Sequence, residues 1–126
     1  MPSKILIVDD FKDYVGLLEK RLRSEGFQTT AVYEGASALE KARSEKPDLI
    51  LLDIMMPEVG GTETRSQLIN DPATKNIPII FLTGLRAPHP SKKPVIDGVR
   101  VVGKSKDFSE LLAAIHEVLE KKFNRQ

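Results

Sequence analysis

Three short, uninterrupted apolar runs restrict the folds open to this chain more than any other feature. They occupy residues 5–8, 49–52 and 79–82 of the 126 residues. A strand with one face in water alternates apolar and polar residues, whereas a strand buried on both faces does not. Because a parallel sheet covered by helices on both sides buries its strands in this way, the runs predict the central strands of such a sheet.

Further strands and helices alternate with these runs along the chain. The β-branched segments at residues 27–33 and 99–102 predict two more strands. Apolar residues recur at helical spacing in four segments, of which the third has only a thin apolar stripe: 14–22, 38–42, 62–69 and 108–119. The alternation predicts an α/β, doubly wound, flavodoxin-like fold with a five-stranded parallel sheet and helices on both faces. We expect one domain over residues 1–126.

Composition excludes several classes of function. The chain has no cysteine and two histidines, which argues against disulfides and against thiolate or imidazole metal sites. Its formal charge of +1 gives no electrostatic footprint for nucleic acid or for a membrane surface. No apolar run is long enough to cross a bilayer, and none near the N-terminus resembles a signal peptide. We therefore expect a cytoplasmic protein that binds neither nucleic acid nor membrane directly.

Polar side chains stand where the predicted strands end. Asp9 and Asp10 follow the first apolar run, and Asp53 follows the second. Thr83 ends the next strand, and Lys104 follows the last one. Ligands of doubly wound sheets bind beyond the carboxyl ends of the strands, near the switch in strand order. We therefore expect these five side chains to converge on one edge of the sheet.

Their chemistry favours a metal and a phosphoryl group. Two carboxylates at ~4 Å repel each other by about 4 kcal/mol at an effective dielectric near 20, so a cation must offset the repulsion. Hard oxygen ligands suit Mg²⁺, which binds through one or two carboxylates together with phosphate oxygens. A lysine can hold a phosphoryl oxygen, and an aspartate can form an aspartyl phosphate. The paired aspartates thus predict a metal site, and Asp53 predicts a phosphoryl acceptor.

Plainer interpretations exist for each residue taken alone. Adjacent aspartates after a strand often only cap the next helix, Asp53 fits ordinary turn chemistry, and Lys104 fits a solvated charge. We favour the functional interpretation because all five residues fall at the ends of strands. A nucleotide-binding flavodoxin-like protein is disfavoured, because the loop after the first strand is acidic and not rich in Gly, Ser or Thr. A hydrolase would need a general acid where Met55 stands.

The motifs resemble those of the receiver domain of response regulators in two-component signalling. The matching pieces are "ILIVDD", "PDLILLDIMMP", "IPIIFLTG" and Lys104 after the last strand. The resemblance covers nearly the whole chain, and the order and spacing of the pieces make it specific. It implies a phosphoprotein that takes part in phosphorelay signal transduction and is a signalling module, not an enzyme, although it assists its own phosphorylation and dephosphorylation.

The resemblance also assigns a role to each site residue. It implies that Asp53 is the phosphoacceptor, with Mg²⁺ as the cofactor. Asp10 would be a direct metal ligand, Asp9 would assist, often through water, and the backbone carbonyl of Met55 would be the third protein ligand. Thr83 would be the switch hydroxyl that binds the phosphoryl group, and Lys104 would pair with that group.

The implied partners are a phosphoryl donor and a downstream protein. The donor would be the phosphohistidine of a sensor histidine kinase or phosphotransfer protein, for which small acyl phosphates substitute. The downstream protein partner is not identified by the sequence. The alternative hypothesis is a receiver-fold protein-interaction module that works without phosphorylation.

The sequence departs from the family pattern after Thr83. Pro88, Pro90 and Pro94 disfavour a regular fourth helix, so we expect this helix to be degenerate, with at most a short turn opening near Pro94. Val101 stands where the family often has an aromatic residue. Ser105 replaces a usual proline, which predicts a trans Lys104–Ser105 peptide bond. We therefore expect phosphorylation to cause a local response and the output surface to be largely preformed.

Overall fold

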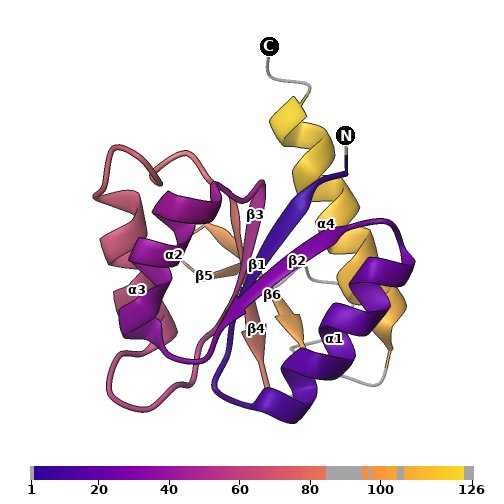
Figure 1. Cartoon of the computed structure of the whole chain (residues 1–126), viewed down its shortest axis with the longest axis horizontal. Helices are drawn as coiled ribbons and strands as arrows, with labels where there is room; N and C mark the ends of the chain where they lie inside the picture. The colour runs from indigo at the N-terminus through magenta and orange to yellow at the C-terminus, as the bar shows by residue number, and fades with distance from the viewer. Residues whose placement is uncertain (1, 85–94, 97, 105–106, 124–126) are drawn as a thin grey trace.

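A six-stranded sheet lies between two layers of helices (Figure 1). The computed structural model describes residues 2–84, 95–96, 98–104 and 107–123. The strands are β1 Lys4–Val8, β2 Gln28–Val32, β3 Leu49–Asp53, β4 Ile79–Thr83, β5 Val95–Ile96 and β6 Val99–Gly103. Their order in the sheet is β2-β1-β3-β4-β6-β5. All pairs are parallel except β5 with β6.

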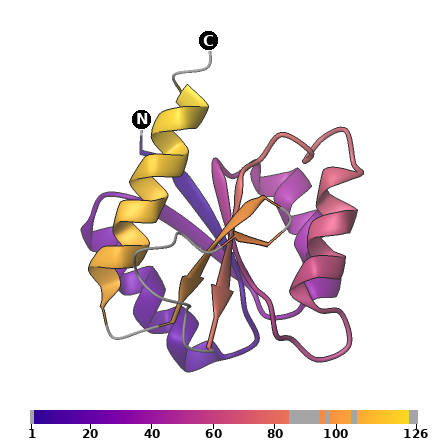
Figure 2. The same ribbon diagram turned by 180° about the vertical axis from the view of Figure 1, so that it is seen from behind.

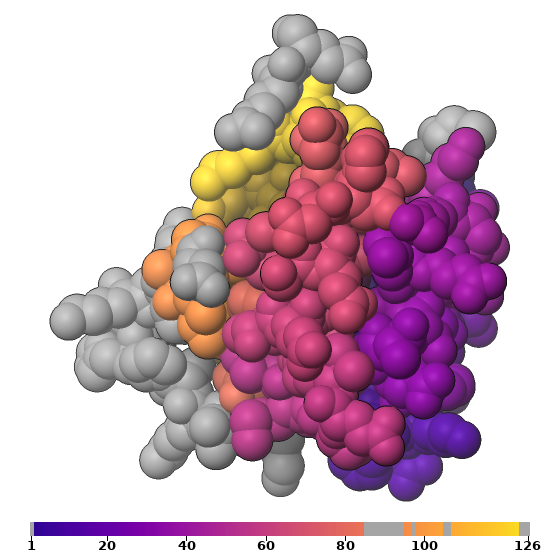
Figure 3. Space-filling view, turned by 90° about the vertical axis from the view of Figure 1, so that its left-hand side faces the viewer, coloured from indigo at the N-terminus to yellow at the C-terminus, as the bar shows by residue number. Residues whose placement is uncertain are grey.

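Two of the described helices cover each face of the sheet. The helices are α1 Lys12–Ser24, α2 Ala38–Glu45, α3 Gly61–Ile69 and α4 Phe108–Phe123, with a short 3₁₀ turn, η1, at Gly35–Ser37. Figures 1 and 2 show α1 and α4 on one face, and α2 and α3 on the other. Figure 3 views the molecule from the side that α2 and α3 cover. Among the described residues, no helix has the length and apolarity that a membrane crossing requires.

The uninterrupted apolar runs supply both hydrophobic cores at once. In β1, Ile5 and Ile7 join the core beneath α1 and α4, while Leu6 and Val8 join the core beneath α2 and α3. All four side chains are fully buried. Because successive side chains of a strand point to opposite faces, a strand with helices on both sides needs apolar residues at every position. The predicted doubly wound fold is confirmed.

The five predicted parallel strands are present as β1, β2, β3, β4 and β6, and the structure adds a sixth strand that the sequence did not predict. Val95 and Ile96 form β5, which pairs antiparallel with β6 through Val95↔Arg100 and Ile96↔Val99. Gly98 stands before β6 with φ +79°, a conformation that glycine adopts at little cost and that suits a tight connection. The β-branched pair favours extended backbone, so a strand begins at Val95 and not a helical turn. The expected degenerate helix over residues 85–93 and the Lys104–Ser105 bond lie outside the described residues.

The thin apolar stripe of the predicted third helix has a structural explanation. Thr64 is fully buried in α3, and its hydroxyl donates to the carbonyl of Gly60 at 2.9 Å. A Cβ on Gly35 would come within 2.4 Å of that hydroxyl oxygen, so a glycine is needed opposite it. The polar threonine therefore occupies a core position, because its hydroxyl is satisfied within its own helix turn.

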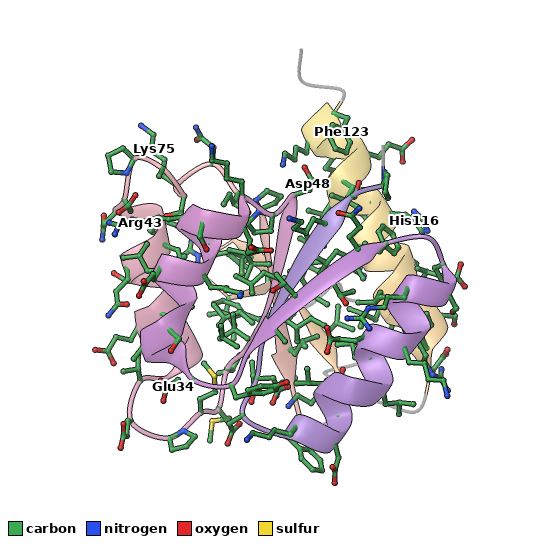
Figure 4. The ribbon with its side chains drawn as sticks, in the orientation of Figure 1. Glu34, Arg43, Asp48, Lys75, His116 and Phe123 are labelled. Atoms are coloured by element: carbon green, nitrogen blue, oxygen red, sulfur yellow. The ribbon has the colours of Figure 1, made fainter. Side chains whose placement is uncertain are left out.

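The amino end of the sheet is tied to the last helix by Asp48. Its Oδ2 accepts a hydrogen bond from the backbone N–H of Lys4 at 2.9 Å, and its Oδ1 lies 3.3 Å from Lys122 Nζ. Figure 4 shows Asp48 at the same end of the molecule as Phe123, and Glu34 at the opposite end, beyond the carboxyl end of β2. The predicted site residues lie at the other end of the sheet, at its carboxyl edge, on the same side as Glu34.

Candidate functional site

The three aspartates lie together at the switch in strand order. The chain passes from β1 outward to β2 and then returns to β3 on the other side of β1. Asp9 and Asp10 follow β1, and Asp53 ends β3. Each of the three offers a carboxylate oxygen, and these oxygens lie within 4.8 Å of one another. The predicted convergence of the carboxylates is therefore observed, at the place where doubly wound sheets bind ligands.

Asp9 is the innermost carboxylate and has an incompletely satisfied oxygen. Its side chain is fully buried, and its Oδ1 accepts a hydrogen bond from the backbone N–H of Phe11 at 3.0 Å. Its Oδ2 forms an ion pair with Lys104 Nζ at 2.6 Å, but receives no hydrogen bond of regular geometry from the described residues. Asp10, in contrast, is exposed. The pair therefore offers one carboxylate to the interior and one to solvent.

Neither aspartate acts as a simple helix cap. Phe11 occupies the N-cap position of α1, and no side chain makes a cap hydrogen bond there. The contact from Asp9 Oδ1 goes to the N-cap residue itself and not to a later N–H of the first turn. The plain interpretation of the two aspartates as capping residues is therefore not supported.

Lys104 reaches the carboxylates from the adjacent part of the sheet. Its backbone N–H donates to the carbonyl of Thr83 at 2.7 Å, which extends the pairing of β4 with β6 by one residue. Its Nζ then lies 3.4 Å from Asp53 Oδ2, in addition to its contact with Asp9. The lysine side chain is only 13% exposed, and within the described part of the chain its ammonium is the group that faces both buried carboxylates.

The remaining predicted site residues lie next to this cluster. Thr83 is buried at the end of β4, directly across from Gly103 in the register. Met55 follows Asp53 by two residues, and its backbone N–H donates to Asp53 Oδ1 at 3.4 Å. The Met55 side chain is 67% exposed and lies on the solvent side of the loop. The structure thus brings Asp9, Asp10, Asp53 and Lys104 into one group, with Thr83 and Met55 adjacent in the chain or sheet.

The pKa of Asp53 reflects the charge balance of the group. Burial, and after it the neighbouring Asp9 carboxylate, raise the pKa of Asp53 to about 6. Lys104 and the Met55 N–H act in the opposite direction but do not compensate fully. Among the described residues of this group, two buried carboxylates face one ammonium, which leaves a deficit of positive charge. A divalent cation beside Asp9 and Asp10 is the natural way to remove it.

The ionised form of Asp53 is expected to destabilise the fold at neutral pH. A carboxyl group whose folded-state pKa lies near 6 and above its usual 3.8 makes the free energy of unfolding fall as pH rises between these values. The Asp53→Asn protein is therefore expected to be more stable than wild type at pH 7, by as much as about 3 kcal/mol. The gain is expected to vanish below about pH 4, where the carboxyl is protonated in both states.

Urea titrations from pH 4 to pH 8 without divalent cations measure this difference. Glu120→Gln, an exposed carboxyl on α4, is the matched control and is expected to show little change across the range. An Asp53→Asn protein no more stable than wild type at pH 7 would contradict the charge deficit.

Tyr14 is a neighbour of the site that the sequence does not reveal. In the sequence it is one residue of the apolar stripe of the first predicted helix. In the structure, the Lys104 ammonium lies 4.8 Å from the centroid of the Tyr14 ring. Tyr14 follows Asp10 by four residues, and this short spacing is the only sequence signal that points to the site.

The comparisons with known proteins agree with this geometry. The family model of the response regulator receiver domain matches residues 5–116. The chain belongs to this family. As a receiver domain of two-component systems, it is a signalling module of a class that pairs with histidine kinases or phosphotransfer proteins. The family resemblance and the flavodoxin-like fold predicted from the sequence are both confirmed.

The matched segment makes up different shares of two curated relatives. The response regulator PleD of Caulobacter vibrioides is 40% identical over 85 residues, which are 68% of this chain but 19% of PleD. The polar-differentiation response regulator DivK of Brucella anthropi is 37% identical over 83 residues, 66% of this chain and 68% of DivK. The chain thus spans about a fifth of the first relative and two thirds of the second.

Solved structures show the same fold. The response regulator TrrA from Thermotoga maritima, in complex with Mg²⁺ and BeF, matches with a TM-score of 0.77 and 31% identity, covering 91% of this chain and 97% of TrrA. A response regulator receiver domain protein from Methanospirillum hungatei matches with a TM-score of 0.84 at 24% identity, covering 100% of both chains. The second likeness is one of fold alone. The first concerns a receiver whose structure contains Mg²⁺ and a beryllium fluoride group.

Proposed function

We propose that this receiver domain accepts a phosphoryl group on Asp53 in a Mg²⁺-dependent reaction. The observation that supports the proposal most is that Asp53 lies between the carboxylates of the aspartate pair and the ammonium group of Lys104. Its carboxylate shares a cluster with Asp9 and Asp10, and its Oδ2 lies 3.4 Å from Lys104 Nζ. The nucleophile, a candidate metal site and a cation for the phosphoryl oxygens thus meet in one place.

The donor set suits Mg²⁺. Asp10 would bind the ion directly, Asp9 would support it, and Asp53 and the Met55 carbonyl would complete the protein ligands. The buried Asp9 Oδ2, which lacks a regular hydrogen bond, and the exposed Asp10 favour a hard cation that retains several waters. When bound, the ion supplies positive charge that orients and polarises the phosphoryl oxygens.

The side chains of the receiver carry out the remaining steps. An oxygen of the Asp53 carboxylate attacks the phosphorus atom, a new O–P bond forms, and the bond from phosphorus to the donor breaks. From phosphohistidine the leaving group is the imidazole nitrogen, and from acetyl phosphate it is acetate. Lys104 would leave its carboxylate partners to bind a phosphoryl oxygen, and the Thr83 hydroxyl would donate to another. This lysine shift is electrostatically reasonable, because the phosphoryl group brings its own negative charge to Asp53.

The proposed donor is the phosphohistidine of a sensor histidine kinase or phosphotransfer protein, and the proposed recipient of the signal is a further protein. The family membership supports the donor, because receiver domains pair with such proteins. The cytoplasmic location and the single domain over residues 1–126 stay predictions, as does a response that remains local to the site.

Intact-mass spectrometry tests the proposal directly. Wild-type protein incubated with acetyl phosphate and Mg²⁺ is expected to gain the mass of one phosphoryl group, whereas EDTA is expected to prevent the gain. Asp53→Asn is the control for the position and is expected to gain nothing. An unchanged wild-type mass with acetyl phosphate and with several phosphorylated histidine kinases would instead favour an interaction module that works without phosphorylation.

A further inference from the structure

The lysine of the site has an aromatic neighbour as well as two carboxylates. Lys104 Nζ lies 2.6 Å from Asp9 Oδ2, 3.4 Å from Asp53 Oδ2 and 4.8 Å from the centroid of the Tyr14 ring. A cation within about 6 Å of a ring centroid is attracted by the negative face of the ring, most strongly where water is excluded. The Lys104 side chain is 13% exposed, so the contact is largely shielded from solvent.

We propose that Tyr14 is a positioning residue for Lys104, with its ring serving as a cation–π platform that holds the ammonium over the phosphoryl site. The inference rests on the proposed function and adds a residue to it. The ring attracts the ammonium without accepting a hydrogen bond through its face. The three N–H donors of Lys104 therefore remain available for carboxylate or phosphoryl oxygens.

The platform matters most when Lys104 changes partners. During phosphoryl transfer the ammonium must give up contacts with Asp9 and Asp53 and take up a phosphoryl oxygen. A carboxylate at the Tyr14 position would compete for the ammonium, whereas an aliphatic side chain would not hold it. A ring attracts the ammonium while leaving the direction of its hydrogen bonds free, so it suits a lysine that moves between neighbouring acceptors.

The surroundings of Tyr14 hold its ring in place. Tyr14 is half-buried on α1 and packs against the core beneath α1 and α4. It also lines a cavity of about 310 Å³ together with Gly103 of β6 and Phe108 of α4. The hydroxyl adds no charge, because burial and the nearby Asp9 and Asp53 raise the pKa of Tyr14 to about 12.

A pair of substitutions separates the ring from the hydroxyl. Tyr14→Phe keeps the ring and is expected to react with acetyl phosphate within about twofold of wild type. Tyr14→Leu keeps apolar volume but removes the ring, and its phosphorylation rate at saturating Mg²⁺ is expected to fall about tenfold. Tyr33→Leu is the matched control, because the Tyr33 ring lies 5.2 Å from a different cation, Lys12 Nζ. This control is expected to react at the wild-type rate.

Two further measurements show whether Tyr14 acts through Lys104. In the unphosphorylated protein, the Cε protons of Lys104 are expected to be shifted upfield by the ring in wild type and Tyr14→Phe, but not in Tyr14→Leu. In a Lys104→Ala background, Tyr14→Leu is expected to change the phosphorylation rate by less than about twofold, because the group that the ring positions is gone.

The outcomes distinguish this inference from the function on which it rests. A wild-type protein that takes no phosphoryl group overturns both, although the Lys104 proton shifts still report the contact itself. A wild type that is phosphorylated, with Tyr14→Leu and Tyr14→Phe equally fast or equally slow, overturns the platform alone. A full tenfold effect of Tyr14→Leu that persists without Lys104 also overturns it, since the ring then acts through the fold.

Discussion

Asp10→Ala is expected to lower the rate of Mg²⁺-dependent phosphorylation by acetyl phosphate by more than about 100-fold, since losing even an outer partner of a metal ligand costs roughly 10–100-fold. Asp10 is the exposed member of the aspartate pair, and its carboxylate lies in the cluster with Asp9 and Asp53. It is therefore the proposed ligand with the freest access to a hydrated ion. Removing it leaves a cluster in which Lys104 already occupies the two remaining carboxylates.

Asp9→Ala is expected to have a smaller effect, about tenfold, for two opposing reasons. The substitution removes a supporting contact to the metal. It also removes a charge that raises the pKa of Asp53, and it frees Lys104 to interact with Asp53 alone. The nucleophile is thereby more fully ionised near pH 6, which partly offsets the weaker metal binding.

Rates over a Mg²⁺ titration distinguish these two losses. For Asp10→Ala, we expect the rate to keep rising at Mg²⁺ concentrations that saturate the wild type. Glu34→Gln, at an exposed position beyond β2 on the same edge of the sheet, is the matched control for loss of a surface carboxylate. The proposed metal site would be contradicted by an Asp10→Ala protein with the wild-type rate and Mg²⁺ dependence.

Phe81→Ala is expected to lower the free energy of unfolding by about 3–5 kcal/mol, the range for truncating a buried aromatic side chain. Phe81 lies in β4, is fully buried, and belongs to the core beneath α2 and α3. It stands between Leu52 of β3 and Val101 of β6 in the register. A loss of this size is a large part of the stability of an ordinary domain.

Chemical denaturation monitored by circular dichroism measures this effect. Ile69→Ala is the control, because Ile69 lies on the same side of the sheet in α3 but is 38% exposed, and its truncation is expected to cost less than about 1 kcal/mol. If Phe81→Ala fails to fold, Phe81→Leu provides a smaller truncation and is expected to cost about 1–2 kcal/mol. Equal losses for Phe81→Ala and Ile69→Ala would contradict the assignment of Phe81 to the core.

The central strands and the position of the carboxylate cluster were determined by the sequence alone. Three uninterrupted apolar runs predict strands buried on both faces, and the structure contains them as β1, β3 and β4. This inference succeeds because burial on both faces leaves no polar position within a strand. The aspartates at the ends of two of these strands then predict a carboxylate cluster, because parallel strands present their carboxyl ends at one edge.

Other features of the structure could not be predicted from local sequence patterns, because they depend on contacts between segments of the chain. The sixth strand arises because Val95 and Ile96 pair with the edge of β6. A strand of two residues is too short to be predicted from the sequence. The buried Thr64 follows from its hydrogen bond to Gly60 and from the close approach of Gly35. In both cases a contact between segments decided a conformation that local propensity leaves open.

The same distinction applies inside the site. Sequence identifies Asp9 and Asp10 as a pair, but only the tertiary structure makes one fully buried and paired with Lys104 and leaves the other exposed. Likewise, the sequence identifies Tyr14 only as one residue of a helical apolar stripe, and the fold alone places the Lys104 ammonium near its ring. Residue type and spacing are local properties, whereas desolvation and charge balance depend on every group that the fold brings within a few ångströms.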